Sequence, residues 1–554
     1  MLWNFIWNYA TIGATEFIKM QSTDKKTFTA SKILLNTLSK IGIKNIFGYP
    51  GSAVLSVYDE LSKQNEIKHY LFRHEQSAVH AAEGYSRVSG NCGVVLVTSG
   101  PGASNTITGI ANAYLDGYPL IVIAGQVSSD VSGRNSFQEL NYTEIAKPCS
   151  KAVFKISTAE EIESSILQAY LIATSGKKGP VVIEIPKNIF QQQIEYKNLS
   201  LPYDKFAPVN KHDIDIAFDI LKNSKNPVVV CGGGVVHSNA YDELMDFVEL
   251  TNIPVVSTMM GIGAFSQNHP KYAGMIGLYG EVSANNVLKN SDTILVLGAR
   301  FNDRITSAFD IEDLNSKNII QVDINSAELI KNLKADLAIN ADIKDFLAVL
   351  NAKIEHSFDF SFETQTCKRD KFVANSSNLT MAKVASEFSK FLQDKNIMIA
   401  AEVGQHQISL IKNFEFVSPL IASGGLGTMG FGFCAAIGAS IALDKSPIVV
   451  FAGDGSFQMN SQELAVCKQY GLPVKIFVMN NKSLGLVRQT QDEQYSTRFE
   501  TDLINPDFVK LSESYGVSAI RIDNVADVNG AFEKVFSENI PYVVEFITDE
   551  NENV

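Results

Sequence analysis

The chain has 554 residues, which is too long for one hydrophobic core and predicts roughly three to four domains. Hydrophobic residues make up 45% of it and charged residues 19%, as in ordinary soluble globular proteins. The formal net charge of −13 argues against nucleic acid as a partner, because phosphates require a basic face. It leaves an anionic small substrate open, because a local pocket can be positive on an acidic protein.

Residues 1–25 do not read as a targeting or anchoring segment. A signal peptide begins basic and continues apolar, whereas here the first cation is Lys19, after Glu16. The apolar stretch is interrupted by Asn4 and Asn8 and is too short to span a bilayer. We therefore expect a disordered or interfacial tail, no membrane association, and Met20 as an alternative start of the protein.

The six cysteines are scattered along the chain and include no C-x-x-C pair. This pattern favours buried free thiols over disulfides or zinc ligands, and a reducing cytoplasm as the location. The cysteines are Cys92, Cys149, Cys231, Cys367, Cys434 and Cys467.

Short runs rich in Val and Ile alternate with amphipathic stretches along almost the whole chain. In chain order the runs are Gly93–Thr98, Leu120–Ala124, Val181–Ile185, Val228–Cys231, Thr293–Leu297, Ile448–Ala452 and Val474–Met479. Continuous apolar runs of this length are typical of strands buried on both faces, in parallel sheets covered by helices. The predicted class is α/β, built from doubly wound units.

Two polar stretches, 191–213 and 355–378, lack long apolar runs and are predicted linkers. They divide the chain into domains at about 26–190, 210–352 and 378–554, each of ordinary domain size. The first and third domains share a plan of strand, Gly-rich turn and helix.

The third domain carries the sharpest motif. A run PIVVFA leads into Gly-Asp-Gly-Ser at 453–456, a helix-like stretch at Ser461–Tyr470, and a run VKIFVM that ends in Asn480 and Asn481. Strand–helix–strand places Asp454 and Asn481 at the carboxyl ends of two parallel strands, where such sheets bind ligands. A carboxylate and an amide oxygen suit Mg²⁺ completed by phosphate oxygens, and the glycines allow close approach of a diphosphate. A plain turn followed by an unrelated Asn pair is the alternative, which the strand before each element disfavours.

This motif resembles that of thiamine-diphosphate enzymes. Further stretches are similar to the acetolactate synthase branch of that family: GYPGSAVLSVYDEL (48–61), FRHEQSAVHAAEGYSRVSG (72–90), VTSGPGASN (97–105), AGQV (124–127), ASGGLGTMGFGFCAAIGA (422–439) and GDGSFQMNSQELA (453–465). The resemblance extends over nearly the whole chain from about residue 27. It implies a pyrimidine-binding domain, a central nucleotide-binding domain and a diphosphate-binding domain, each a doubly wound parallel sheet.

Glu75 stands between a short apolar strand and an Ala-rich helix. Taken alone, it reads as a first-turn charge that stabilises the helix start. The resemblance instead implies that Glu75 is the catalytic glutamate, which bonds the aminopyrimidine ring of the cofactor and promotes loss of the thiazolium C2 proton. The resemblance also implies that the cofactor then attacks the 2-oxo carbon and takes up electrons as CO₂ leaves. Because this glutamate and the metal site lie in different domains, the resemblance implies two chains per site, in a homodimer or homotetramer.

The resemblance assigns further positions to cofactor binding. Met429 matches the apolar residue that supports the bent cofactor, and Gln405 and His406 match donors to the diphosphate. The full set of thiamine-diphosphate contacts is Gly51, Gln126, Gly404, Gln405, His406, Gly427, Met429, Gly453, Gly455, Ser456, Gly485 and Leu486. The Mg²⁺ ligands are Asp454, Asn481 and Ser483.

The middle domain contains PVVVCGGGV (227–235), a strand followed by three glycines but not a G-x-G-x-x-G fingerprint. With its neighbouring stretches it resembles the FAD-binding domain of acetolactate synthases, in which FAD is structural. The implied FAD contacts are Gly232, Gly233, Arg300 and Asp323. Related domains bind other nucleotides or none, so FAD is one of several readings.

The resemblance also indicates the substrate side. Arg304 matches the residue that binds the carboxylate of the acceptor 2-oxo acid, although on its own it also reads as a surface arginine paired with Asp303. Other matching positions are Phe137, Gln138, Lys187 and Thr490.

Several positions depart from the family pattern. Thr490 replaces a tryptophan that favours 2-oxobutanoate, so the acceptor preference stays open. Leu278 and Tyr279 replace a Met-His pair, Lys147 replaces an arginine near FAD, and the chain ends at NENV before the tail that often covers the site.

The implied activity is that of an acetolactate synthase catalytic subunit, which decarboxylates pyruvate and transfers the two-carbon unit to a second 2-oxo acid. The product, 2-acetolactate, leads toward branched-chain amino acids, and a small regulatory subunit is a candidate partner. Three alternatives remain: another carboligase or decarboxylase of the superfamily, a non-catalytic paralogue, and an oxidase that uses FAD as electron acceptor.

Overall fold

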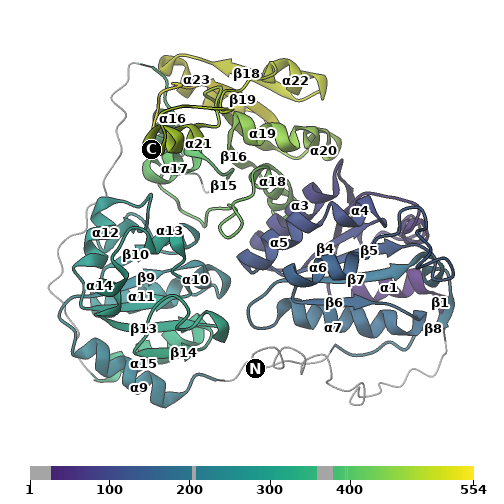
Figure 1. The fold of residues 1–554 in the computed structure, drawn as a ribbon, viewed down its shortest axis with the longest axis horizontal. Coiled ribbons are helices and arrows are strands. Elements are labelled where there is room, and N and C mark those ends of the chain that lie inside the picture. The colour runs from purple at the N-terminus through teal and green to yellow at the C-terminus, as the bar shows by residue number, and fades with distance from the viewer. Residues whose placement is uncertain (1–25, 202–207, 358–377, 393–394, 396) are drawn as a thin grey trace. The chain divides into compact units, whose positions relative to one another are not determined.

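The structure is a computed structural model that describes residues 26–201, 208–357, 378–392, 395 and 397–554. The predicted tail 1–25 with Met20, most of the second predicted linker, and Cys367 lie outside these residues. The chain divides into two compact units, of which the first contains the N-terminal sheet and the second the central and C-terminal sheets (Figure 1). The predicted α/β class is confirmed by these parallel sheets, whereas the domain boundaries stay a prediction.

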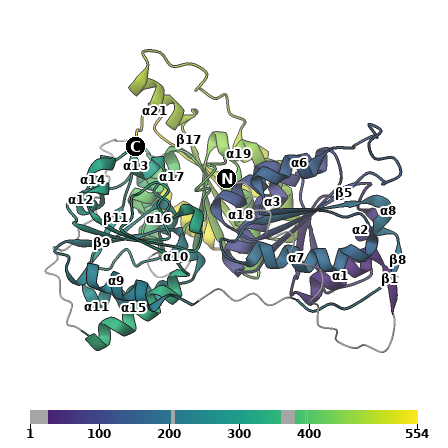
Figure 2. The same ribbon diagram turned by 60° about the horizontal axis from the view of Figure 1, so that its bottom comes forward.

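The first unit is built on a parallel sheet whose strand order is β3-β2-β4-β5-β7-β6. Its strands are β2 (Asn45–Gly48), β3 (Lys68–Leu71), β4 (Gly93–Val97), β5 (Leu120–Gln126), β6 (Ala152–Lys155) and β7 (Pro180–Pro186). Its helices are α1 (Ala30–Lys40), α2 (Leu55–Leu61), α3 (Glu75–Ser89), α4 (Pro101–Ser104), α5 (Ile107–Asp116), α6 (Tyr142–Ala146), α7 (Ile162–Thr174) and α8 (Lys187–Phe190). Figure 2 shows α1 and α7 on one face of this sheet and α3 and α6 on the other.

The predicted linker 191–213 is partly wrong. Its first residues form β8 (Gln193–Glu195), which pairs antiparallel with β1 (Thr27–Thr29) inside the first unit. Three residues without a long apolar run carry no strand signal of their own, and the pairing arises because the two ends of the unit meet.

The central sheet has the order β11-β10-β9-β12-β13-β14 and is parallel throughout. Counted along the chain this is 3-2-1-4-5-6, the doubly wound order typical of dinucleotide-binding folds. The strands are β9 (Pro227–Cys231), β10 (Val255–Ser257), β11 (Tyr272–Met275), β12 (Thr293–Leu297), β13 (Asn318–Asp323) and β14 (Leu337–Asn340).

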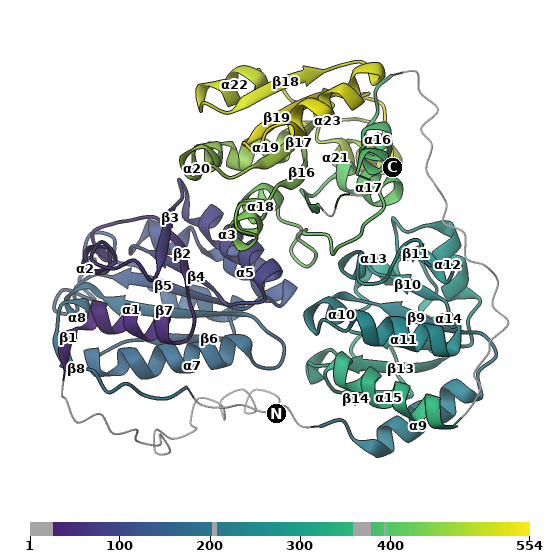
Figure 3. The same cartoon turned by 180° about the vertical axis from the view of Figure 1, so that it is seen from behind.

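Helices cover both faces of the central sheet (Figure 3). The cluster on one face includes α9 (Lys211–Lys222), α10 (Gly233–His237), α11 (Tyr241–Thr251) and α15 (Ile343–Ser357). The cluster on the other face includes α12 (Val282–Lys289), α13 (Asp303–Thr306) and α14 (Ile311–Asn315).

The C-terminal sheet has the order β15-β16-β17-β19-β18 and is also parallel. Its strands are β15 (Met398–Ala401), β16 (Ile448–Gly453), β17 (Val474–Asn480), β18 (Ser518–Ile522) and β19 (Tyr542–Ile547). Its helices are α16 (Met381–Phe391), α17 (Gln405–Asn413), α18 (Phe431–Ala442), α19 (Asp454–Asn460), α20 (Leu464–Tyr470), α21 (Gly485–Gln494), α22 (Phe508–Ser514) and α23 (Val528–Phe536). A cluster of aromatic rings surrounds the fully buried Phe388, and it includes Phe414, Phe451, Phe477 and Phe532.

The helix after the Gly-Asp-Gly motif begins earlier than predicted. We expected it at Ser461–Tyr470, but α19 starts at Asp454 itself and a 3₁₀ turn at Ser461–Glu463 separates it from α20. An acidic residue in the first turn favours a helix start, because it faces the partial positive charge of the free N–H groups.

The cysteine prediction holds for the residues that the structure describes. Cys92, Cys231, Cys434 and Cys467 are buried and form no disulfide, and Cys149 is half-buried and forms none.

Candidate active site

Asp454 stands where β16 ends and α19 begins. The register pairs Gly453 with Met479, so the ends of β16 and β17 lie side by side. The carboxylate is 2% exposed; Oδ1 accepts a hydrogen bond from the Gly455 N–H at 2.9 Å, and Oδ2 accepts one from Asn505 Nδ2 at 2.7 Å. Burial raises the pKa of Asp454 to about 6, against the opposing effect of these donors. A divalent cation would stabilise the charged form that burial disfavours.

Asn481 and Ser483 lie on the loop that follows β17. Both are buried; Asn481 Oδ1 accepts a hydrogen bond from the Ser483 N–H at 3.3 Å, and the Ser483 hydroxyl has no hydrogen-bond partner. With Asp454 they offer a carboxylate, an amide oxygen, a hydroxyl and backbone carbonyls, which fit a hard cation such as Mg²⁺. Within the described ranges no group of three or more His, Cys, Asp or Glu side chains could hold a metal, so a carboxylate-rich or thiolate site is absent there.

His406 lies in the first turn of α17 and faces glycines on two elements. A Cβ at Gly404 would come within 2.8 Å of its ring, and a Cβ at Gly453 within 2.9 Å. Gly404 also has φ +149°, a conformation that L residues rarely adopt. Burial lowers the pKa of His406 to about 4, so the ring is neutral at pH 7, and its buried Nε2 has no hydrogen-bond partner. An unpartnered buried nitrogen at a helix N-terminus fits a polar ligand such as a diphosphate.

Gln405 is the other predicted diphosphate contact. Both polar atoms of its side chain make hydrogen bonds to other residues of the protein. Its Oε1 accepts a hydrogen bond from Asn481 Nδ2 at 3.3 Å, and its Nε2 donates to Gln489 Oε1 and to the Glu552 carbonyl, both at 3.1 Å. A Cβ at Gly485 would stand 1.9 Å from Gln405 Oε1. Gly485 therefore lets α21 begin directly against the Gln405–Asn481 pair.

The predicted cofactor contacts Gly427 and Met429 lie on the loop that precedes α18. Gly427 is exposed and has φ +72°, whereas Met429 is half-buried. Gly455 lies near Met429, since a Cβ at Gly455 would be 3.7 Å from Met429 Cε. Ser456 Oγ donates to the Val403 carbonyl at 3.3 Å.

The last two predicted contacts of this domain lie on α21. Leu486 and Thr490 are half-buried, and Thr490 Oγ1 bonds the Leu486 carbonyl at 2.9 Å within the helix.

Sequence reasoning missed two polar residues at this edge of the sheet. Glu402 is 1% exposed, and its carboxylate accepts hydrogen bonds from the Gly430 N–H at 2.7 Å and the Phe433 N–H at 2.9 Å. Its signal was an acid directly after a buried strand. Asn505 had no local signal, because it contacts Asp454 from 51 positions away.

In the first unit, Glu75 is the first residue of α3 and is 9% exposed. The helix is capped by His74, whose Nδ1 accepts the Gln76 N–H at 3.2 Å, so Glu75 is not the cap. Its Oε2 instead accepts a hydrogen bond from Asn105 Nδ2 at 2.9 Å. A Cβ at Gly102 would lie 3.3 Å from Oε1. A buried carboxylate held by another element suits a positioned proton acceptor.

The other predicted residues of the first unit differ in exposure. Phe137 is 88% exposed, Lys187 is exposed at the start of α8, and Gln138 has a positive φ of 63°. Gln126 is buried, and its Nε2 donates to the Leu140 carbonyl and to Glu184, so its amide also serves the fold.

Gly51 lies against Thr98 in the same unit, since a Cβ at Gly51 would be 2.4 Å from Thr98 Cβ. This close packing explains why position 51 needs a glycine.

In the central domain, the glycines after β9 and β12 meet at the point where the strand order reverses. A Cβ at Gly232 would be 2.2 Å from the Gly298 carbonyl oxygen, and one at Gly233 would be 3.2 Å from Met260 Cβ. Asp323 ends β13, is 9% exposed, and accepts the Asn325 N–H at 2.8 Å. These features suit a nucleotide bound outside the carboxyl ends of the strands.

The two predicted arginines lie on the segment after β12. Arg300 is half-buried, and its carbonyl accepts a hydrogen bond from Asn332 at 2.8 Å. Arg304 is exposed on α13, where its guanidinium is accessible to a ligand.

No helix among the described residues is long and apolar enough to cross a membrane.

Comparison with known proteins identifies the family. Residues 28–145 match the thiamine pyrophosphate enzyme N-terminal TPP binding domain, 214–350 the central domain, and 402–546 the C-terminal TPP binding domain. The chain is 37% identical to the acetolactate synthase large subunit of Lactococcus lactis, over 96% of this chain and 94% of the relative. It is 38% identical to a probable acetolactate synthase large subunit of Methanocaldococcus jannaschii, over 94% and 92%. It is 36% identical to the acetolactate synthase isozyme 3 large subunit of Escherichia coli, over 93% and 94%. The chain therefore belongs to the acetolactate synthase large-subunit family of thiamine pyrophosphate enzymes.

Proposed function

We propose that this thiamine-pyrophosphate-dependent enzyme is an acetolactate synthase catalytic subunit, which decarboxylates pyruvate and joins the two-carbon unit to a second 2-oxo acid. The observation that carries the proposal is the buried cluster of Asp454, Asn481 and His406 at the carboxyl edge of the C-terminal sheet. Glu75, which the family resemblance matches to the proton acceptor, is also buried, and this supports the proposal.

Asp454, Asn481 and Ser483 would hold Mg²⁺, which in turn would hold the diphosphate of the cofactor. His406 and the N–H groups at the start of α17 would contact the diphosphate directly. Met429 would support the ring system from the loop before α18. Thiamine diphosphate, when bound, supplies the electron sink that lets a 2-oxo acid lose CO₂.

Glu75 would exchange a proton with the pyrimidine of the cofactor. Asn105 donates a hydrogen bond to Oε2, which leaves Oε1 for that contact. Glu75 and Asp454 lie in different units of the chain, and the family resemblance implies that two copies complete each site. We therefore propose a homodimer or a homotetramer.

The central domain would bind FAD as a structural cofactor. The strand order, the close crossing of Gly232 and Gly298, and Asp323 at the end of β13 support a nucleotide there. Flavin absorbance in the purified protein, released on denaturation, tests this assignment. A flavin-free protein with full activity would remove FAD from the proposal.

Arg304 would bind the carboxylate of the acceptor, with Phe137, Gln138, Lys187 and Thr490 around the substrate. The relatives are named large subunits, which supports a small regulatory subunit as a partner. The cytoplasm remains the proposed location.

The deciding experiment measures acetolactate formed from pyruvate by the purified protein, with and without thiamine diphosphate, Mg²⁺ and 2-oxobutanoate. We expect acetolactate only when both cofactors are present, and little with Asp454→Asn. Acetaldehyde without acetolactate would indicate a decarboxylase, and oxygen uptake coupled to turnover would indicate an oxidase. No turnover of pyruvate by a cofactor-loaded protein would reject the catalytic role.

A further inference from the structure

The residues Thr501–Asn505, here called the clamp segment, lie antiparallel to the loop after β17 that carries Asn481 and Ser483. The Leu484 N–H donates to the Thr501 carbonyl and the Leu503 N–H to the Lys482 carbonyl, both at 2.8 Å. An isolated bridge joins Ser483 to Asp502. The clamp segment therefore holds the backbone on both sides of Ser483.

The clamp segment ends in Asn505, whose side-chain nitrogen and oxygen both make hydrogen bonds. Nδ2 donates to Asp454 Oδ2 at 2.7 Å and to Asn480 Oδ1 at 2.9 Å, and Oδ1 accepts from Gln458 Nε2 at 2.9 Å. One amide group thus connects the residue that follows β16 with the last residue of β17.

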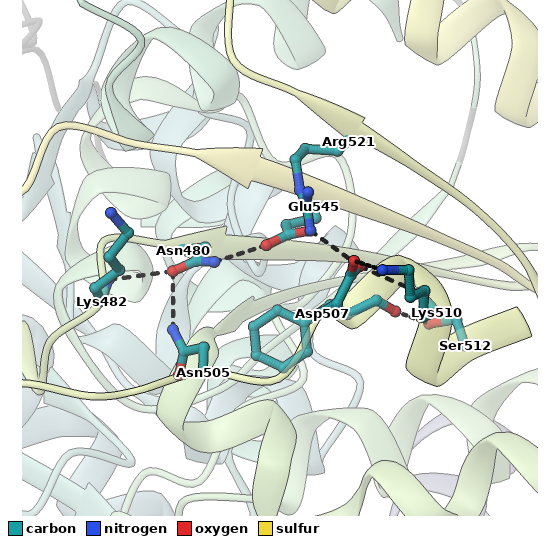
Figure 4. Close-up of polar contacts among 9 residues, drawn as sticks. Asn480, Lys482, Asn505, Asp507, Lys510, Ser512, Arg521 and Glu545 are labelled. Carbon is teal, nitrogen blue, oxygen red and sulfur yellow. Dashed lines mark hydrogen bonds and ion pairs between the residues drawn. The ribbon is translucent and has the colours of Figure 1, made fainter. Parts of the chain in front are cut away.

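Asn480 is held by a hydrogen bond to the neighbouring strand β19, which is in turn bonded to β18 (Figure 4). Its Nδ2 donates to Glu545 Oε1 at 2.7 Å, and Glu545 Oε2 accepts from Arg521 Nε at 2.7 Å. Glu545 is 1% exposed on β19, and both of its oxygens are paired with donors. The polar contacts therefore run from the edge strand β18 through β19 and β17 to Asp454.

Apolar burial helps to place the middle of the clamp segment, because Leu503 is half-buried and a Cβ at Gly455 would be 3.3 Å from its Cδ1, but it does not place the end of the segment. Ile504, next to Asn505, is fully exposed. The described contacts that hold this end of the segment are polar, and the shortest of those made by Asn505 reaches a predicted metal ligand. A hydrogen bond to one carboxylate oxygen fixes the rotation of that carboxylate and so the direction of its remaining lone pairs.

We infer that Asn505 is a positioning residue for the metal site: it orients the Asp454 carboxylate and locks it to Asn480, so that the two loops present their ligand oxygens together. The inference rests on the proposed function, because it assumes that Asp454 binds the cation. Partners that orient metal ligands typically change metal affinity about 10–100-fold when they are removed.

The test measures Mn²⁺ binding to the full-length protein with thiamine diphosphate, from the electron paramagnetic resonance signal of free Mn²⁺. Asn505→Ala removes both N–H donors, and Asn505→Leu keeps about the same volume but has no N–H group and adds no charge beside the cation. We expect both variants to bind Mn²⁺ at least about tenfold more weakly than the wild type. The matched control is Asn524→Ala, which removes an exposed N-cap of the same domain, whose Oδ1 accepts the Ala526 N–H at 3.0 Å. This control should bind Mn²⁺ like the wild type.

Melting temperatures of the metal-free proteins show whether each variant is folded at the assay temperature, and Asn505→Leu carries the test alone if Asn505→Ala is not. Wild-type Mn²⁺ affinity in a folded Asn505 variant would overturn the inference. Asp454→Asn distinguishes a failure of the metal site from a failure of the role of Asn505. If it also binds Mn²⁺ like the wild type, the metal site itself is misplaced; if it loses binding while Asn505 variants keep it, only the role of Asn505 fails.

Discussion

Glu402→Gln tests a buried carboxylate whose charge state sets part of the stability of the C-terminal domain. Glu402 accepts hydrogen bonds from two backbone N–H groups at the start of α18, an arrangement that favours the charged carboxylate. Burial outweighs these bonds and raises the pKa of Glu402 from 4.5 to about 7. Because one pKa unit corresponds to 1.36 kcal/mol, the folded state disfavours the charged form by about 3 kcal/mol.

The sign of the pH dependence follows from the direction of the shift. The folded protein holds this proton more tightly than the unfolded chain, so the contribution of Glu402 to stability is complete below pH 4.5 and is lost as the pH rises through about 7. Glutamine does not titrate. Between these limits the stability of wild type relative to Glu402→Gln should fall by about 3 kcal/mol.

The assay is thermal unfolding of both metal-free proteins at about pH 5 and about pH 8. For a domain of this size, about 3 kcal/mol corresponds to a change of roughly 6–12 °C in the difference between the two melting temperatures. Asp454, whose pKa is also raised, is present in both proteins and cancels in the comparison. An equal difference at both pH values would show that Glu402 does not carry a perturbed charge, and would refute the reasoning.

Three further substitutions probe the site and the core. Glu75→Gln should fold with an unchanged melting temperature but lose about 10²–10⁴-fold in acetolactate formation, because it cannot take up a proton; retained turnover would remove Glu75 from the mechanism. Gly485→Ala should weaken thiamine diphosphate binding in equilibrium dialysis, since its Cβ would collide with Gln405, whereas Gly530→Ala, which meets no atom within 4 Å, should bind normally. Phe388→Ala should destabilise the C-terminal domain by about 3–5 kcal/mol, measured by denaturant unfolding, because it empties the centre of the ring cluster; a loss below about 1 kcal/mol would contradict this packing.

The Val- and Ile-rich runs predicted the sheets well, because a strand buried on both faces must be apolar at every position. The run Thr293–Leu297 coincides with β12, and the run at Val474–Met479 differs from β17 by one residue. The same pattern placed Asp454 and Asn481 at neighbouring strand ends, since adjacent parallel strands finish at one edge of the sheet. The family followed from motifs of the same kind.

Local pattern could not reveal the contacts that orient these residues. The start of α19 at Asp454, the pairing of β8 with β1, and the carboxylate of Glu402 on α18 depend on which segments meet in the fold. Asn505 is the clearest case, because an asparagine in a polar loop carries no signal until the chain brings it to Asp454. The sequence by itself determined the α/β class, the strands and the chemical type of the site, since burial and motif spacing are local properties. Only the tertiary structure decided which side chains hold the ligands in place, because hydrogen bonds between distant residues depend on how the elements pack.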